Sequence, residues 1–386
     1  MNILIKDAGR YYHEHFGEPA FIVRSPGRIN LIGEHTDYND GFVLPAAVDN
    51  AAFISIGERT DNQIHLFSVD YQEYYTGSTE AITQSPQQWP NYILGIVDVL
   101  QKSGYKCKGF NAVLIGDVPI GAGMSSSAAV ECATIFALNE LFGFKLPRMA
   151  MVKLAQRAEN EFVGVRCGMM DQFASMFGKR GNAIELDCRS NEFAYYPLKS
   201  DEYDLLLVNT RVKHSLAESN EYNTRRQNCE TGVAKVQQFF PEVRSLRDVT
   251  PEMLSKTINT LEDEVYKQCL YVVEEIIRVQ EACEDLRQED IEAFGKKMFA
   301  THKGLSTLYK VSCTELDFLV QFAAGYKDVI GSRMMGGGFG GCTINLIKKS
   351  GMAGFVDSVS EAYLEHFKVL PDIFPVRTAD GTSMIV

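Results

Sequence analysis

Residues 119–130 read PIGAGMSSSAAV and join a glycine-containing loop to the start of an apparent helix. Gly121 and Gly123 can adopt backbone conformations closed to other residues and let a ligand approach the main chain closely. Three serines at 125–127 follow, and then an alanine-rich stretch with helical periodicity. Backbone N–H groups, hydroxyls and the positive end of a helix would converge there, which suits a di- or triphosphate. A serine N-cap after a flexible turn fits the same residues, so both interpretations stay open.

The length and the order of elements predict two α+β domains. A chain of 386 residues exceeds one typical core, and its 45% hydrophobic and 23% charged residues are ordinary globular composition. Strand and helix patterns are mixed without strict βαβ alternation, which favours α+β over a doubly wound sheet. We expect an N-terminal domain at 1–202 and a C-terminal domain at 203–386.

Charge and cysteine content narrow the class further. The net charge of −12 argues against nucleic-acid and membrane-surface partners, which are polyanions. No apolar run approaches the ~20 residues of a membrane span, and the start of the chain has no secretory signal pattern. Nine scattered cysteines without a CxxC fit reduced thiols in a cytosolic protein, not a zinc site or a disulfide framework.

Hydrophobic periodicity and turn residues place the main elements. Residues 1–18 predict a helix ending at Gly17, and 20–37 predict two strands about a turn at Pro26-Gly27, followed by a polar turn. Further strands are expected within 41–59, 63–71, 109–119, 182–188 and 203–210. Helices are expected within 90–104, 121–143, 146–164, 263–283 and 285–302, and a glycine-rich loop runs into a strand within 331–347.

Three segments carry candidate chemistry. The stretch GEHTD at 33–37 fits a metal site, an acid/base pair or a polar turn without a function. Asp171 lies in the apolar stretch CGMMDQFASMFG, where a buried carboxylate needs a partner; it is either a catalytic base or a helix N-cap. Arg28 follows the turn by the GEHTD stretch and could pair with Asp171, or be an exposed strand arginine.

A bound nucleotide triphosphate would bring Mg²⁺, which takes one or two protein oxygens besides phosphate oxygens. The candidate ligands are the Ser127 hydroxyl and the Glu159 carboxylate, and a surface role for Glu159 is the alternative. The loop at 119–130 is not a Walker A loop, because no GK[ST] follows. The run MMGGGFGG at 334–341 is by itself a weak signal, since it lacks dinucleotide-fingerprint spacing.

Together these segments resemble the sugar and isoprenoid kinases of the GHMP superfamily. PIGAGMSSSAAV resembles their phosphate loop, PGRINLIGEHTDYNDGFVLPAAVD at 26–49 their N-terminal motif, and RMMGGGFGGCTI at 333–344 their C-terminal glycine motif. GEHTDYNDG and EYNTRRQNCE at 221–230 are similar to galactokinases in particular. The resemblance runs from about residue 10 to the end.

The resemblance implies a two-domain GHMP-kinase-like fold with the active site in the interdomain cleft, and ATP-dependent phosphorylation of galactose at its anomeric hydroxyl. By position it implies that Asp171 is the base, that Arg28 stabilises the phosphoryl group, and that Ser127 and Glu159 bind Mg²⁺. It implies sugar contacts from Glu34, His35, Thr36, Asp37 and Tyr222. It implies ATP contacts from Ser68, Trp89, Tyr92, Gly121, Ala122, Gly123, Met124, Ser125, Ser126 and Ser127. Met124 replaces a leucine common in the loop, a volume-conserving change without expected consequence.

Two other functions stay open at this stage. A kinase of the same fold could act on N-acetylgalactosamine or arabinose, because the sequence does not reveal the space near carbon 2. A galactose-sensing regulator could bind both ligands without turnover, but such proteins lose serine-loop residues, and this chain retains SSSAA and Asp171. We expect a cytoplasmic monomer or weak homo-oligomer whose partners are galactose and ATP.

Overall fold

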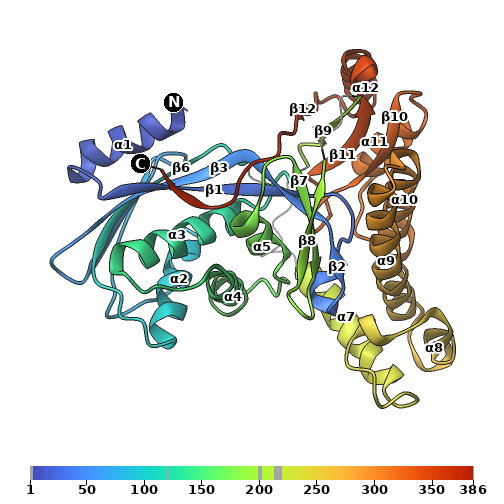
Figure 1. Cartoon of the computed structure of the whole chain (residues 1–386), viewed down its shortest axis with the longest axis horizontal. Coiled ribbons are helices and arrows are strands. Elements are labelled where there is room, and N and C mark those ends of the chain that lie inside the picture. Colours follow the sequence, from blue (N-terminus) through green and yellow to red (C-terminus); the bar gives the residue numbers. More distant parts are fainter. Residues whose placement is uncertain (1–2, 120, 199–201, 213–219, 386) are drawn as a thin grey trace.

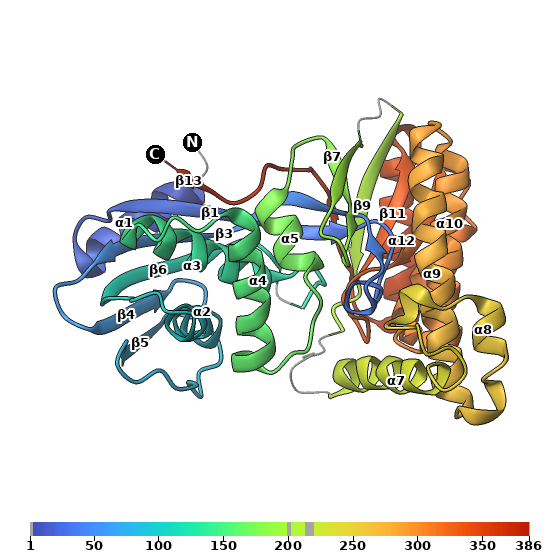
Figure 2. The same cartoon turned by 60° about the horizontal axis from the view of Figure 1, so that its bottom comes forward.

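The computed structural model describes residues 3–119, 121–198, 202–212 and 220–385. Its strands form three sheets, ordered β13-β1-β3-β6-β4-β5, β10-β11-β9-β12 and β2-β7-β8 (Figures 1 and 2). The strands are β1 (Phe21–Asn30), β2 (Phe42–Val43), β3 (Pro45–Glu58), β4 (Gln63–Ser68), β5 (Glu73–Ser78), β6 (Phe110–Gly116), β7 (Asn182–Asp187), β8 (Phe193–Pro197), β9 (Tyr203–Asn209), β10 (Val329–Met334), β11 (Cys342–Lys348), β12 (Asp372–Pro375) and β13 (Ser383–Ile385).

Helices cover these sheets. They are α1 (Ile3–Phe16), α2 (Asn91–Lys102), α3 (Ser126–Phe142), α4 (Arg148–Ala158), α5 (Met170–Phe177), α7 (Glu221–Val236), α8 (Pro251–Ser255), α9 (Asp263–Arg287), α10 (Ile291–Gly304), α11 (Thr314–Ala324) and α12 (Met352–Phe367). Single π-helical turns extend α4 over Glu159–Val163 and α10 over Leu305–Tyr309. None of the helices in the described part of the chain is long and apolar enough to cross a membrane.

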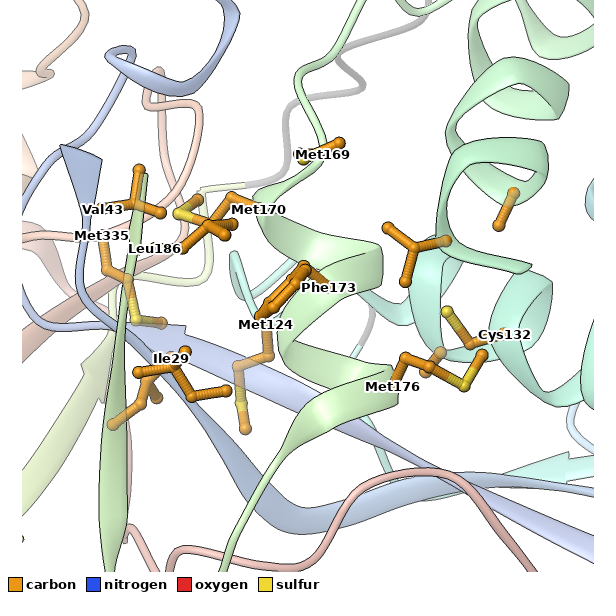
Figure 3. Packing of buried hydrophobic residues seen from close by; sticks show 14 of the residues in the cluster. Ile29, Val43, Met124, Cys132, Met169, Met170, Phe173, Met176, Leu186 and Met335 are labelled. Carbon is orange, nitrogen blue, oxygen red and sulfur yellow. The ribbon is translucent and has the colours of Figure 1, made fainter. Parts of the chain in front are cut away.

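The N-terminal sheet is packed on both faces. Helix α1 lies on one face, and α2, α3 and α4 gather on the other (Figure 1). The core under α5 is methionine-rich: Met124, just before α3, lies beside Phe173 of α5 (Figure 3), and both side chains are buried. Because apolar side chains at this density hold their neighbours in place, this packing fixes the loop before α3 against the helix that carries Asp171.

The second half of the chain builds another sheet with helices on both sides. Strand β9 pairs with β11 and β12, α11 and α12 pack over one face, and α9 and α10 lie along the other side (Figure 2). The last strand leaves this half, because β13 pairs antiparallel with β1 in the N-terminal sheet. The division at residue 202 stays a prediction, and residues 383–385 pair with the N-terminal part rather than with the 203–386 segment assigned to them.

Most predicted elements are present, and one predicted turn is wrong. Pro26 and Gly27 form no reversal: β1 is one strand, and its pairing with β3 shifts register between Pro26 and Arg28. A bulge explains the sequence pattern equally well, because proline and glycine are tolerated where a ladder is interrupted. This shift directs Arg28 toward the loop at 121–125, where its backbone N–H donates to the Met124 carbonyl at 3.1 Å.

Candidate active site

Arg28 and Asp171 form the centre of the candidate site. Arg28 Nε and Nη2 donate to the two carboxylate oxygens of Asp171, each at 2.8 Å, so the pair is bidentate. Arg28 Nη1 also donates to the Gly123 carbonyl, and the Ser125 hydroxyl donates to Asp171 Oδ2. Burial by itself lowers the pKa of Arg28, but the nearby carboxylates, Asp171 first, raise it overall. The predicted pair is thus brought together, and the exposed-arginine alternative is wrong.

The helix-cap alternative for Asp171 is also wrong. Met169 occupies the N-cap position of α5, and Asp171 lies in the first turn of the helix. Its carboxylate is engaged by Arg28 and Ser125 rather than by the backbone at the helix start. A carboxylate held in two hydrogen bonds by a guanidinium has a fixed orientation, which a positioned base requires.

The phosphate loop has the unusual backbone that its glycines predict. Gly121, Gly123 and Ser125 all have positive φ, at 76°, 72° and 55°, before α3 begins at Ser126. Ser125 occupies the N-cap position but makes no side-chain capping bond, since its hydroxyl donates to Asp171. The N-cap interpretation of the serines is therefore wrong for Ser125. A left-handed non-glycine residue costs energy, and such residues concentrate at functional sites.

The glycine-rich loop at 335–341 packs directly on the phosphate loop. A Cβ added at Gly123 would lie 2.9 Å from the Met335 carbonyl oxygen, and one at Gly336 would lie 3.2 Å from Gly123 Cα. Side chains at these positions would push the two loops apart. The glycines that gave only a weak signal in the sequence therefore permit close backbone contact between the two halves of the chain.

Buried acids lie behind the phosphate loop. Glu159 is 7% exposed, so the surface-glutamate alternative is wrong. Glu159 Oε2 accepts from Gln172 Nε2 at 2.6 Å, and Gln172 Nε2 also donates to Glu131 Oε2 at 3.0 Å. Burial first, and then the charge of a neighbouring acid, raises the pKa of both glutamates. Glu131 Oε1 and Gln172 Oε1 have no hydrogen-bond donor among the described residues.

Glu131 and Gln172 are site residues that the sequence interpretation missed. Glu131 lies four positions after Ser127 on α3, and residues four apart share a helix face. A glutamate on an alanine-rich, largely buried helix, in register with a candidate ligand, is a signal that could have found it. Gln172 follows Asp171 directly, but the residues around it give no pattern that would assign it a partner.

The predicted metal ligands are close to each other. The Ser127 side chain is close enough to Glu159 to lower its pKa slightly, but burial first and then Asp171 raise that pKa overall. Within the described ranges no group of three or more histidine, cysteine or acidic side chains could alone hold a metal ion. Mg²⁺ does not need such a cage, because it commonly takes one carboxylate and completes its shell with water and phosphate oxygens. The hydroxyl and carboxylate therefore fit a Mg²⁺ that arrives with a triphosphate.

The turn at 33–37 lies near Arg28, because the charges of Glu34 and Asp37 both contribute to raising the Arg28 pKa. Glu34 is buried, and its Oε1 accepts from Arg333 Nη2 at 3.1 Å and from the Gly336 N–H at 2.8 Å. The Thr36 hydroxyl is fully buried and lies 2.9 Å and 2.6 Å from the carbonyl oxygens of Gly33 and Phe42. Thr36 therefore closes the turn, and its proposed role in sugar binding stays a prediction.

His35 and Asp37 are the remaining residues of the turn, and their pKa values are shifted in opposite directions. His35 Nδ1 lies 2.7 Å from the Tyr38 hydroxyl, and burial lowers the His35 pKa to about 3, so the ring is neutral at physiological pH. The Asp37 pKa is raised to about 7, by burial first and then by the charge of Asp171. Tyr222 of α7 packs its ring 5.4 Å from that of His35. Neutral rings and an acid near its midpoint give a surface that can donate to and accept from hydroxyls.

The predicted adenine contacts divide into two places. Trp89 is 4% exposed, stacks on Tyr71 with ring centroids 6.5 Å apart, and donates to Glu73 Oε2 at 2.9 Å. Ser68 is buried at the end of β4, and its hydroxyl accepts from the Tyr71 N–H at 3.4 Å. Tyr92 lies nearer the acids: burial and the charges of Glu159 and Glu131 raise its pKa. Binding of the adenine ring by these residues stays a prediction.

Comparison with known protein families identifies the class of protein to which this fold and candidate site belong. Residues 91–179 match the family described as GHMP kinases N terminal domain, and 282–363 match GHMP kinases C terminal. The fold is therefore the α+β fold of GHMP kinases, as predicted. Residues 10–58 match the Galactokinase galactose-binding signature, which includes both Arg28 and the 33–37 turn.

Individual relatives narrow the family. A galactokinase of Thermotoga neapolitana is 43% identical over 363 residues, which are 94% of this chain and 99% of that protein. A galactokinase of Thermotoga maritima is 42% identical over the same share of each chain. The crystal structure of Lactococcus lactis galactokinase complexed with galactose has a TM-score of 0.94 at 31% identity, covering 98% of this chain and 99% of that one. The chain belongs to the galactokinase family.

Proposed function

We propose that this chain transfers the γ-phosphoryl group of ATP to the anomeric hydroxyl of galactose and releases galactose 1-phosphate and ADP. The observation that carries the proposal is the bidentate Arg28–Asp171 pair. It contacts Gly123 and Ser125 of the phosphate loop, and Asp171 is close enough to Asp37 of the galactose-binding signature to raise the Asp37 pKa. A base and a cation between a phosphate site and a hydroxyl-binding turn are what phosphoryl transfer to a sugar needs.

Each residue of the pair has a distinct role in this proposal. Asp171 accepts the proton of the anomeric hydroxyl as that oxygen attacks the γ-phosphorus, and the bond to the β–γ bridging oxygen breaks to release ADP. Arg28 holds the Asp171 carboxylate in place and offsets negative charge on the transferring group. The turn at 33–37 and Tyr222 orient the sugar, so that one hydroxyl faces the base.

Ser127 and Glu159 would hold Mg²⁺ on the phosphate side. When bound, the ion would neutralise negative charge on the triphosphate and align it for transfer. Gln172 Nε2 and Cys167 Sγ both donate to Glu159 Oε2, and this fixes the orientation of the carboxylate. The phosphate-loop N–H groups and the start of α3 would bind the remaining phosphate oxygens.

A coupled ADP-release assay across a hexose panel tests the proposal. Galactose should support turnover that requires both ATP and Mg²⁺, and glucose should not. Faster turnover with N-acetylgalactosamine or arabinose would reassign the substrate within the same fold. Tight galactose and ATP binding without ADP release would favour the sensing regulator instead. The cytoplasmic location and the monomeric or weakly oligomeric state remain predictions.

A further inference from the structure

The turn proposed to bind the sugar is held partly by its own hydrogen bonds, from Thr36 and Asn39, and partly by side chains from a distant part of the chain. Gly33 has φ 96° and His35 has φ 65°, so two of its residues are left-handed. Gly33 is also tightly enclosed, because a Cβ there would lie 2.8 Å from the Phe42 carbonyl oxygen and 2.9 Å from Val279 Cγ2. A left-handed residue that is not glycine persists only where its surroundings hold it.

One face of α9 supplies that support. Tyr271, Glu275 and Val279 are four residues apart and therefore point to the same side of the helix. Glu275 Oε1 accepts the Gly33 N–H at 2.9 Å, and the Tyr271 hydroxyl donates to the Glu34 carbonyl at 3.0 Å. Two neighbouring residues of the turn are thus held by side chains more than two hundred positions away in sequence.

Glu275 is itself rigidly held. It is fully buried, and its carboxylate accepts from the Thr301 hydroxyl at 3.0 and 2.9 Å and from the Arg278 guanidinium. A buried carboxylate is retained only where donors surround it, and here the Gly33 N–H is one of those donors. The position of Gly33 is therefore tied to α9 directly, and through Thr301 to α10.

We propose that Glu275, assisted by Tyr271, is a positioning residue for sugar binding that sets the backbone of the 33–37 turn. It acts through Gly33 and Glu34 and does not touch the sugar. The inference rests on the proposed function, because it takes this turn to be the galactose site. Its expected signature is selective: a displaced turn weakens galactose binding, whereas the phosphate loop and its contacts to Arg28 are unchanged.

Glu275→Gln and Tyr271→Phe test this role, with Glu274→Gln as the matched control. Glu274 is the neighbouring glutamate, it is partly exposed, and its Oε2 lies 3.7 Å from the same Arg278. Each test variant should raise both the KM and the calorimetric Kd for galactose about tenfold, equivalent to about 1.4 kcal/mol. The KM for ATP should stay within about twofold, and Glu274→Gln should change neither constant.

The results separate positioning from simple structural support. A lower melting temperature with an unchanged galactose Kd in the folded fraction would overturn the proposal, and so would equal increases in both KM values. If Glu275→Gln does not fold, Tyr271→Phe decides in the same way, because it removes only one hydroxyl. If the wild type binds and phosphorylates another sugar instead, the proposed function fails. The positioning role is then tested with that sugar.

Discussion

The buried carboxylates on the sugar side and on the phosphate side of the site have different partners. The sugar-side carboxylate, Glu34, is paired with the fully buried Arg333, and the turn around it is fixed by α9. The phosphate-side carboxylates, Glu131 and Glu159, share one neutral donor, the amide of Gln172. The charge of Glu34 is therefore compensated by a cation of the protein, whereas the charges of Glu131 and Glu159 are not.

This difference matches the charge that each ligand would bring to its side of the site. An uncharged sugar brings no counter-ion, so Glu34 needs a cation from the protein, and Asp37 remains beside it as an acid with a raised pKa. A metal–nucleotide complex brings a cation, and uncompensated buried carboxylates near its phosphate loop are favourable once that cation arrives. Arg28 and Asp171 connect the two sides, because they hydrogen-bond to the phosphate loop and Asp171 also raises the pKa of Asp37 in the turn.

The largest effect should come from the residue that connects the two sides. Asp171→Asn keeps the shape and most hydrogen bonds but cannot accept a proton, so kcat should fall by about 10²–10⁴-fold. Steady-state kinetics beside a direct galactose binding measurement would show kcat lost while affinity and melting temperature change little. Arg28→Ala should also lower kcat, and the double variant should lose less than the product of the single losses.

A different result would assign Asp171 a structural role. In that case Asp171→Asn would lower the melting temperature, while turnover per folded molecule stayed near that of the wild type. The centre of the site would then be a buried ion pair that stabilises the junction of β1 and α5, and the base would have to be found elsewhere.

The next largest effect should concern the phosphate side alone, through its dependence on Mg²⁺. Glu159→Gln removes a ligand charge, so the Mg²⁺ concentration that gives half-maximal rate should rise by about 10–100-fold, the scale typical of altered metal surroundings. Without ligands the variant should melt no lower than wild type, because burial opposes the charge of Glu159. Magnesium titrations of rate and of melting temperature measure both effects.

Glu161→Gln is the matched control for this experiment. Glu161 lies two positions further along, is exposed, and pairs with Arg157 at 2.9 Å. It should leave the magnesium titration unchanged. An unchanged titration for Glu159→Gln as well would remove Glu159 from the metal site.

Sequence reasoning found the chemical groups better than the contacts that hold them. Asp171 could be found because a lone charge in an apolar stretch is unusual and needs a partner. Arg28 is indicated by its place after the expected turn, and Glu159 by the resemblance to GHMP kinases. Glu275 and Arg333 were not found. Glu275 lies in a long amphipathic helix where glutamates are common, and its partner, the Gly33 N–H, is 242 positions away. Only the fold reveals a side chain that serves a distant backbone group.

The fold could also be predicted only in part: the long elements could be predicted from the sequence, but a bulge and a short strand could not. Long periodic helices and β-branched strands were identified, because their patterns repeat over many residues. The Pro26-Gly27 pair predicts a turn where the structure has a bulge, since both structures favour the same residues. Strand β13 has only three residues, and it pairs with β1 at the opposite end of the sequence. A segment so short carries no periodicity from which to predict it.

On the sugar side, the third prediction concerns Asp37. Asp37→Ala should raise the KM for galactose by about tenfold and leave the KM for ATP nearly unchanged, because a buried acceptor lost from a ligand costs about 1–3 kcal/mol. In the wild type, galactose KM should fall as pH rises through about 7, since the raised Asp37 pKa lies there and the carboxylate is the better acceptor. Initial-rate kinetics between pH 6 and 8 would check both, and parallel changes in the two KM values would make the turn purely structural.

The smallest effect concerns the ligand-free stability of the same turn. Burial and Asp171 raise the Asp37 pKa from its ordinary 3.8 to about 7, so the folded protein favours the protonated form. The stability that the protonated form contributes is fully present below the ordinary pKa of 3.8 and is lost as pH rises through about 7.

Asparagine resembles the protonated acid at every pH, so Asp37→Asn should melt higher than wild type by a margin that grows from pH 5 to pH 8. A difference of about 1 kcal/mol corresponds to a shift of about 2 °C or less in a chain of this size. Asp40→Asn is the control, because the Asp40 side chain is 46% exposed, its carboxylate lies 3.6 Å from Arg189 Nε, and asparagine tolerates its left-handed φ of 59°. Calorimetry at both pH values should show a pH-dependent gain for Asp37→Asn alone; an equal shift at pH 5 and pH 8 would mean that the turn does not oppose the charge of Asp37.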